Sequence, residues 1–182
     1  MFSHVICDLD GTLLDSDAAL AGAFIALGVP AEDITFGHVV ATECERLGIS
    51  LDDYLDAYDE SAAQPFAGVE DVIRQLTKST WSICSNKNPR SGHAELARLQ
   101  WDPLLVAFAD SFQGPKSPEP ILEKLSLPRS DVLFLGDTEH DRHCAQNAGL
   151  QFALAAWNPR ASAQPGDLVL TTPQELLSAL QL

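Results

Sequence analysis

The feature that most constrains this chain is an apolar run near its N-terminus that leads directly into two aspartates. Val5-Ile6-Cys7 is followed by Asp8-Leu9-Asp10-Gly11-Thr12. Successive side chains of a strand point to opposite faces, so Asp8 and Asp10 share a face. In open α/β sheets, ligands bind at the carboxyl ends of the strands. Two carboxylates this close repel each other unless a cation or a proton separates them. The pair therefore predicts a metal site, an acid–base pair, or both.

The composition narrows the class of protein. The 182 residues, 46% of them hydrophobic, predict one domain or one domain with a modest insertion. No apolar run is long enough to cross a membrane, and no signal-peptide pattern is present. The four cysteines show no Cys-x-x-Cys spacing, which indicates reduced thiols in a cytoplasmic protein. A net charge of −15 argues against nucleic acid or an anionic membrane as partners.

The acidic charge is concentrated in one segment. Residues 15–64 hold eleven of the 26 acidic residues but only one of the 11 basic residues, Arg46. The same segment has no strand pattern and contains three helix-like stretches, over 17–28, over 35–47 and after the capping residue Ser50. We therefore expect a small α-helical cap domain at 15–64, inserted into a core formed by residues 1–14 and 65–182.

After residue 68 the pattern changes to alternating helices and strands. This alternation predicts an α/β fold, a doubly wound parallel sheet covered by helices on both faces. The expected helices cover 69–76, 90–100, 118–126, 139–148 and the stretch from 173, and the expected strands cover 81–84, 105–109, 131–136, 151–156 and 168–170.

Polar side chains gather just beyond the ends of these strands. Ser85 and Asn86 follow one strand, Lys116 lies in a loop after the next, and Asp137 and Asp141 follow a third. Because the carboxyl ends of parallel strands share one edge of the sheet, we expect these groups to meet Asp8 and Asp10. The five histidines show no grouping typical of metal ligands, and His140 is left outside the site.

These four clusters, in this order, resemble the motifs of the haloacid dehalogenase-like superfamily, in the branch similar to phosphoglycolate phosphatase with a helical cap. The stretch 8–13 matches the first motif, Ser85-Asn86 the second, and 136–141 the fourth. Lys116 matches the third motif, although Ser117 stands where related sequences often have proline. The resemblance covers nearly the whole chain, and it implies a phosphatase acting on a small phosphorylated metabolite.

The resemblance also implies a role for each motif. Asp8 would be the nucleophile that forms an aspartyl-phosphate, and Asp10 the general acid and base. Mg²⁺ would be held by the Asp8 carboxylate, the Asp10 backbone carbonyl and Asp137. Asp141 would hold metal-bound water or orient the catalytic Lys116.

The expected phosphate-binding groups come from two of the loops and the motif lysine. Ser85 and the backbone amides near Asn86, Gly11 and Thr12 would donate to the phosphoryl oxygens, together with Lys116. Lys87, which follows Ser85-Asn86, is the competing lysine, but its loop position favours a solvated side chain. The stretch 157–159 is expected to be a structural loop, and the aromatic residues of the cap are expected to pack its helices.

Particular residues argue for or against related functions. A haloacid dehalogenase needs no leaving-group acid, so Asp10 favours phosphoryl transfer. A phosphonatase-like enzyme would need a cap lysine, which residues 15–64 lack. Three alternatives remain open: a phosphomutase resembling β-phosphoglucomutase, a catalytically silent relative, and a receiver-like switch domain in which Asp110 takes the place of the phosphorylated aspartate.

Overall fold

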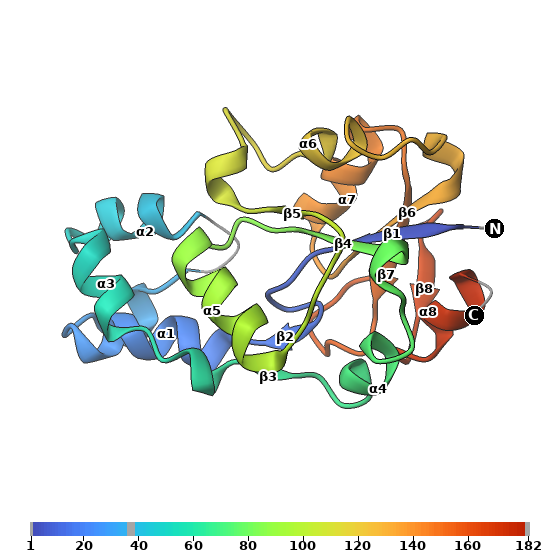
Figure 1. Ribbon diagram of the computed structural model, residues 1–182. Helices are drawn as coiled ribbons and strands as arrows, with labels where there is room; N and C mark the ends of the chain where they lie inside the picture. Colours follow the sequence, from blue (N-terminus) through green and yellow to red (C-terminus); the bar gives the residue numbers. More distant parts are fainter. Residues whose placement is uncertain (1, 36–38, 181–182) are drawn as a thin grey trace.

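A central parallel sheet forms the core of the computed structural model, which describes residues 2–35 and 39–180 (Figure 1). Among the described residues this sheet has six strands in the order β5-β4-β1-β6-β7-β8, and every neighbouring pair is parallel. Their bounds are β1 His4–Cys7, β4 Trp81–Cys84, β5 Val106–Ala107, β6 Val132–Gly136, β7 Gln151–Ala155 and β8 Leu168–Leu170. The strand β1, which carries the two aspartates at its end, therefore lies in the interior of the sheet.

Helices cover both faces of this sheet, as the sequence predicted. On one face lie α4 (Val69–Ile73), α5 (Pro89–Leu99) and α8 (Glu175–Leu180). On the other lie α6 (Glu119–Leu122) and α7 (Glu139–Asn147), above the sheet in Figure 1. The fold is thus a doubly wound α/β fold.

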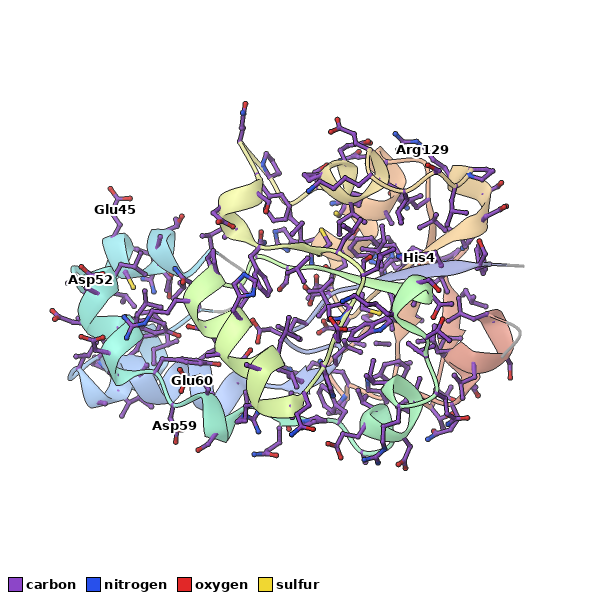
Figure 2. All side chains as sticks on the ribbon, viewed as in Figure 1. His4, Glu45, Asp52, Asp59, Glu60 and Arg129 are labelled. Carbon is purple, nitrogen blue, oxygen red and sulfur yellow. The ribbon has the colours of Figure 1, made fainter. Side chains whose placement is uncertain are left out.

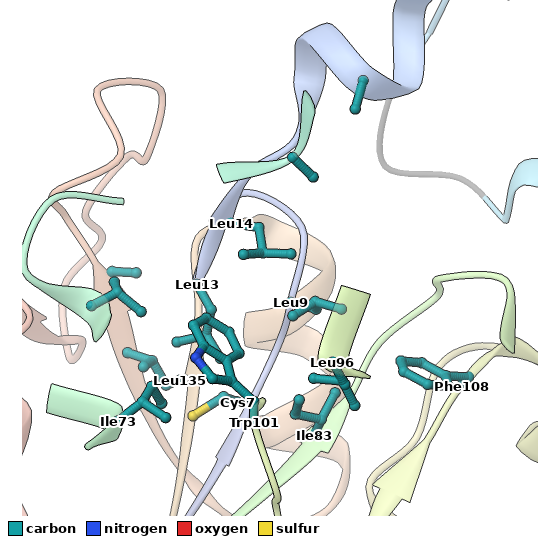
Figure 3. Packing of buried hydrophobic residues seen from close by; sticks show 14 of the residues in the cluster. Cys7, Leu9, Leu13, Leu14, Ile73, Ile83, Leu96, Trp101, Phe108 and Leu135 are labelled. Atoms are coloured by element: carbon teal, nitrogen blue, oxygen red, sulfur yellow. The ribbon is translucent and has the colours of Figure 1, made fainter. Parts of the chain in front are cut away.

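The strands form where apolar side chains can be buried on both faces. Alternate residues of β1 enter separate clusters: Cys7 packs on the side of α4 and α5, and Ile6 packs with Phe134 on the side of α6 and α7. Figure 3 shows the first cluster, where Cys7 and Leu135 lie close to Ile73 and Trp101. Two buried faces explain why β1 and β6 read as continuous apolar runs.

A small helical unit projects from the sheet at the left of Figure 1. It contains α1 (Asp17–Ala26), α2 (Val40–Leu47) and α3 (Leu51–Ala57). It is joined to the core through a two-stranded antiparallel ribbon of β2 (Leu14–Asp15) and β3 (Gln64–Pro65). We call the segment 15–64 the cap; the division into two domains at these positions stays a prediction. The sequence did not predict the ribbon, whose residues lie at the two ends of this segment.

The sequence predicted some helix ends correctly, but other elements are shorter than predicted. Ser50 accepts a hydrogen bond from the Asp53 amide and begins α3, and Gly48 adopts a left-handed conformation at the end of α2. The helix predicted over 35–47 is shorter, since α2 begins at Val40; residues 36–38 lie outside the described part. The strand expected over 105–109 and the helix expected over 118–126 are also shorter, at 106–107 and 119–122.

Much of the acidic charge of the cap faces solvent. Glu45, Asp52 and Asp59 are exposed and project outward from the cap in Figure 2, and Glu60 is half-buried. Glu43 is instead buried, and its hydrogen bond from Arg46 lowers its pKa to about 2. The only basic residue of the cap is therefore engaged within the cap.

No described helix has the length and apolar character needed to span a bilayer.

Two helical glycines allow a test of how tightly α5 packs on the sheet. A Cβ on Gly92 of α5 would overlap the Phe108 ring, whereas a Cβ on Gly22 of α1 would meet no atom within 4 Å. We expect Gly92→Ala to lower the free energy of unfolding by about 1–3 kcal/mol through overpacking. Gly22→Ala should raise it by about 0.5–1 kcal/mol through helix propensity. Urea denaturation of both variants measures the two values, and equal effects would contradict the packing described.

Candidate active site

The polar residues that follow four separate strands line one cavity at the carboxyl edge of the sheet. The cavity has a volume of about 440 Å³. Of the site residues expected from the sequence, all but Thr12 line it: Asp8, Asp10, Gly11, Ser85, Asn86, Lys116, Asp137 and Asp141. His140, left outside the site, is exposed and also lines this cavity.

The loop after β1 is a tight turn built on one carbonyl. The Leu9 carbonyl accepts hydrogen bonds from the amides of Leu13 and Leu14, at 3.0 and 2.9 Å. Gly11 has a φ of +80°, and a Cβ there would lie 2.6 Å from Asp137 Oδ2. Glycine is therefore needed both for the left-handed backbone and for the close approach of the Asp137 carboxylate.

Lys116 joins the first and fourth motifs. Its Nζ lies 2.5 Å from Asp8 Oδ1 and 2.6 Å from Asp141 Oδ1, and all three side chains are at least nine-tenths buried. Burial disfavours the charge on Lys116, but Asp141 and Asp8 outweigh it and hold the pKa of Lys116 well above its usual range. An ammonium has three N–H donors. These two carboxylates use two of them, which leaves a third for a ligand.

Both carboxylate oxygens of Asp141 accept hydrogen bonds. Its Oδ2 accepts hydrogen bonds from the Thr138 hydroxyl at 2.6 Å and from the Thr138 amide at 3.0 Å, while Oδ1 accepts from Lys116. Thr138 and Asp141 thereby form a capping box at the start of α7. Despite burial, Lys116 and these donors lower the pKa of Asp141. With its oxygens engaged in this way, Asp141 is suited to orient Lys116.

Asp137 is positioned by residues from two other loops. The Thr12 hydroxyl donates to its Oδ1 at 2.9 Å, and Asn158 Nδ2 donates to its Oδ2 at 2.9 Å. Asn158 also donates to the Gly11 carbonyl, and Trp157 Nε1 donates to the Thr12 carbonyl. The loop after β7 therefore ties the first motif to the fourth, and it is more than the structural loop expected from the sequence.

The three buried carboxylates fit a divalent cation. One oxygen from each of Asp8, Asp137 and Asp141 lies within 4.8 Å of the others. Burial raises the pKa of Asp8 to about 8, against the attraction of Lys116 and with the repulsion of Asp141 and Asp137. Burial and Asp141 raise the pKa of Asp137 to about 6. Three carboxylates and one ammonium leave an excess of negative charge, which an oxygen-preferring cation such as Mg²⁺ would neutralise.

Lys87 departs from the sequence expectation. It was expected to be a solvated loop residue, but its side chain is only 3% exposed. Its Nζ lies 2.8 Å from Asp10 Oδ1, 2.8 Å from Glu95 Oε1 and 2.7 Å from the Tyr58 hydroxyl. The expectation was wrong because a loop lysine becomes buried when distant acidic side chains provide partners, and Glu95 lies on a helix that the sequence did not connect to the site.

The expected phosphate donors are only partly available. The Gly11 amide donates to the Leu14 carbonyl at 2.7 Å, and the Thr12 amide faces the Leu9 carbonyl at 3.4 Å. Among the described residues, the amides of Leu9 and Asp10 have no such acceptor. These two amides are therefore the donors of the turn that are available to a bound anion, a detail that depends on the turn geometry and not on residue type.

Comparisons with known proteins identify the family of this chain. Residues 5–155 match the family model described as haloacid dehalogenase-like hydrolase. The chain belongs to this family. A phosphoglycolate phosphatase of Xanthomonas campestris is 26% identical over 188 residues, covering 86% of this chain and 84% of that protein. Pyrophosphatase PpaX of Oceanobacillus iheyensis is 24% identical, covering 85% and 83%.

The fold of this haloacid dehalogenase-like hydrolase is shared with solved structures. CbbY from Rhodobacter sphaeroides, solved in complex with phosphate, superposes with a TM-score of 0.74 at 18% identity, and each chain is covered completely. The receiver-like alternative gains no support from the structure. Asp110, the residue that reading would phosphorylate, is exposed and does not line the cavity.

The raised pKa of Asp8 predicts that the ionised Asp8 carboxylate destabilises the folded protein when no metal is bound. The ordinary pKa of an aspartate is 3.8, and that of Asp8 in the fold is about 8. The folded state therefore binds an extra proton between these values, and stability falls as the pH rises through this range. In EDTA we expect Asp8→Asn to be more stable than the wild type at pH 8, by at least about 1 kcal/mol, with a smaller difference at pH 5.5.

Urea denaturation in EDTA at the two pH values measures this difference. A variant less stable than the wild type at pH 8 would show that the attraction to Lys116 exceeds the cost of burying Asp8.

Asn158 provides a second test, because it orients a carboxylate proposed to bind metal. Partners of metal ligands typically change metal affinity by about 10–100-fold when they are removed. We expect Asn158→Ala to weaken Mg²⁺ binding by about tenfold, measured by isothermal titration calorimetry. Asn147→Ala, an exposed amide in α7, is the control and should bind Mg²⁺ as the wild type does. Unchanged affinity in Asn158→Ala would refute the positioning role.

Proposed function

We propose that this protein is a Mg²⁺-dependent phosphatase that hydrolyses a small phosphate monoester through an aspartyl-phosphate on Asp8. One observation carries the proposal. Two carboxylates of the first motif line the same cavity but are held by different lysines, Asp8 by Lys116 and Asp10 by Lys87. Because the two carboxylates have different partners and are buried to different extents, they are suited to different chemical tasks.

Asp8 is suited to be the nucleophile. Lys116 binds its Oδ1, and Thr12 Oγ1 lies 3.5 Å from Oδ2, so the carboxylate is fixed at the cavity wall. In the first step an Asp8 oxygen forms a bond to phosphorus as the bond from phosphorus to the leaving oxygen breaks. The third N–H of Lys116 is available to donate to a phosphoryl oxygen. The amides of Leu9 and Asp10 are further candidate donors.

Asp10 is suited to be the general acid and base. Its side chain is 22% exposed, more than that of Asp8 at 8%, so it is the carboxylate closer to solvent. Asp10 gives its proton to the leaving oxygen in the first step. In the second step it takes a proton from water as the water oxygen attacks phosphorus and the bond to Asp8 breaks. Inorganic phosphate is then released, and both carboxylates return to their starting forms.

Mg²⁺ would be held by the carboxylates of Asp8 and Asp137 and the backbone carbonyl of Asp10, with Asp141 acting directly or through water. Its charge would offset the negative charge of the carboxylates and the phosphate dianion. Lys87 adds no net positive charge to the site, because the Glu95 carboxylate pairs with it. Phosphate monoesters need a barrier reduction above about 20 kcal/mol. A single donor contributes about 3–4 kcal/mol, so cation, nucleophile and positioning must act together.

The substrate class proposed is a small phosphorylated metabolite. The cavity of about 440 Å³ is suited to such a molecule. The relatives named as phosphoglycolate phosphatase and pyrophosphatase support small phosphorylated compounds as the first to test. A panel of phosphoglycolate, pyrophosphate, sugar phosphates and nucleotides, each with Mg²⁺, would rank them by kcat/KM.

Substitution of Asp8 and substitution of Asp10 should block different steps of the reaction. With p-nitrophenyl phosphate, whose leaving group needs no proton, Asp10→Asn should still release one equivalent of nitrophenol per enzyme in a fast burst. Its later turnover should fall by about 10²–10⁴-fold, because the second step lacks its base. Asp8→Asn should show neither burst nor turnover. Rapid-mixing absorbance measurements distinguish these outcomes.

Further controls test the same proposal. EDTA should abolish turnover by the wild type, and Mg²⁺ should restore it. Sustained formation of inorganic phosphate would distinguish a phosphatase from the phosphomutase alternative. Near-normal turnover by Asp8→Asn would exclude Asp8 as the nucleophile.

A further inference from the structure

A buried ammonium connects the cap to the proposed general acid. Lys87, in the loop after β4, has three acceptors from three different parts of the chain: Asp10 Oδ1, Glu95 Oε1 and the Tyr58 hydroxyl, all within 2.8 Å. We call these four residues the Lys87 cluster. Because an ammonium has three N–H donors, these acceptors satisfy Lys87 completely. It has no donor left for phosphate, unlike Lys116.

The second member of the cluster, Glu95, binds this ammonium through a carboxylate oxygen. Glu95 lies on α5 and is fully buried, and its Oε1 accepts hydrogen bonds from Lys87 at 2.8 Å and from Tyr58 at 2.5 Å. Its Oε2 is buried without a hydrogen-bond partner among the described residues. A buried carboxylate is costly unless it is paired. The cost is offset only while Lys87 and Tyr58 stay in place, so the geometry of the cluster is restricted.

Tyr58 is the member of the cluster that belongs to the cap. It follows the last residue of α3, and its hydroxyl donates to Glu95 while accepting from Lys87. Its ring lies beneath the Lys87 ammonium, 4.7 Å from Nζ to the ring centroid. Within the cap, the ring of Tyr54 lies 6.1 Å from that of Tyr58 and 4.4 Å from that of Phe24. The position of the Tyr58 hydroxyl therefore follows the position of the cap.

Among the described residues, two ion pairs also join the cap to the core, and both lie nearer to solvent. Arg160 pairs with Asp17, and their side chains are 51% and 33% exposed. Arg90 on α5 pairs with Asp56 on α3 at 2.7 Å, and the two side chains are 58% and 70% exposed. Exposed pairs of this type contribute little and tolerate rearrangement. Lys87, Glu95 and Tyr58 are buried, so moving the cap away from α5 would leave one N–H donor of Lys87 without its acceptor and would remove the Tyr58 donor from Glu95 Oε1.

We propose that Tyr58, Lys87 and Glu95 are positioning residues that couple the seating of the cap on the core to the placement of the Asp10 carboxyl group. This inference rests on the proposed function, in which Asp10 is the general acid and base. When the cap is seated, Tyr58 completes the coordination of Lys87, and Lys87 fixes Asp10 beside the cavity. When the cap moves away, Lys87 loses one acceptor and no longer holds Asp10 in one position.

The experiment removes one hydroxyl from the cap and measures the first turnover. Misplacement of a reacting group by about 1 Å can cost about 10²-fold in rate. In Tyr58→Phe we expect the first turnover of an alkyl phosphate, which needs a proton on its leaving group, to slow by about tenfold with KM within twofold. The first turnover of p-nitrophenyl phosphate should change by less than twofold. Rapid-quench measurements with Mg²⁺ provide both rates.

Two further sets of variants separate coupling from a general loss of structure. Arg90→Gln, which removes an exposed contact between cap and core, should retain wild-type rates with both substrates. Lys87→Arg should retain more of the alkyl phosphate rate than Lys87→Met, because it keeps a cation beside Asp10.

The possible failures are distinguishable. If Tyr58→Phe slows both substrates equally, or neither, the coupling is refuted while Asp8→Asn remains inactive. If Asp8→Asn is active, or the wild type hydrolyses neither substrate, the proposed function itself fails.

Discussion

The repulsion among three buried carboxylates is the interaction on which the rest of this structure depends. Asp8, Asp137 and Asp141 approach one another closely in a region from which water is largely excluded, and Lys116 compensates only part of their charge. Each carboxylate needs its own supports. Thr12 and Asn158 hold Asp137, while Thr138 holds Asp141. These supports come from loops that lie far apart in the sequence, so the arrangement requires the parallel sheet to bring its strand ends together.

The sequence predicted the parts of the fold that depend on local patterns. Continuous apolar runs such as β1 and β6 are typical of strands buried on both faces, and side chains that directly follow such strands share one edge. Asp8, Ser85 and Asp137 could therefore be placed together from their positions alone. Helix ends with a specific chemical signal, such as Ser50 and Gly48, were also placed well. Where no such signal exists, as in α6, the predicted length was too long.

The remaining features depend on contacts between distant segments. The burial of Lys87 is decided by Glu95 and Tyr58, and neither spacing nor residue type indicates that these side chains meet. Asn158 follows β7 at the same edge as the other site residues, so its position was a signal that the sequence contained. Its partner Asp137, however, is identified only by the geometry. Likewise, the amides available in the turn after Asp8 follow from hydrogen bonds that form only in the folded turn.

The ribbon of β2 and β3 has a consequence for how such a protein can vary. Leu14 pairs with Pro65 and Asp15 with Gln64, so the two ends of the cap segment leave the core side by side. A different segment could occupy the same place if its ends also met, whatever its length or fold, and the strand order of the sheet would be unchanged. The cap and the site residues that follow the core strands can thus evolve on separate parts of one polypeptide, apart from the few side chains, such as Tyr58, that connect the two.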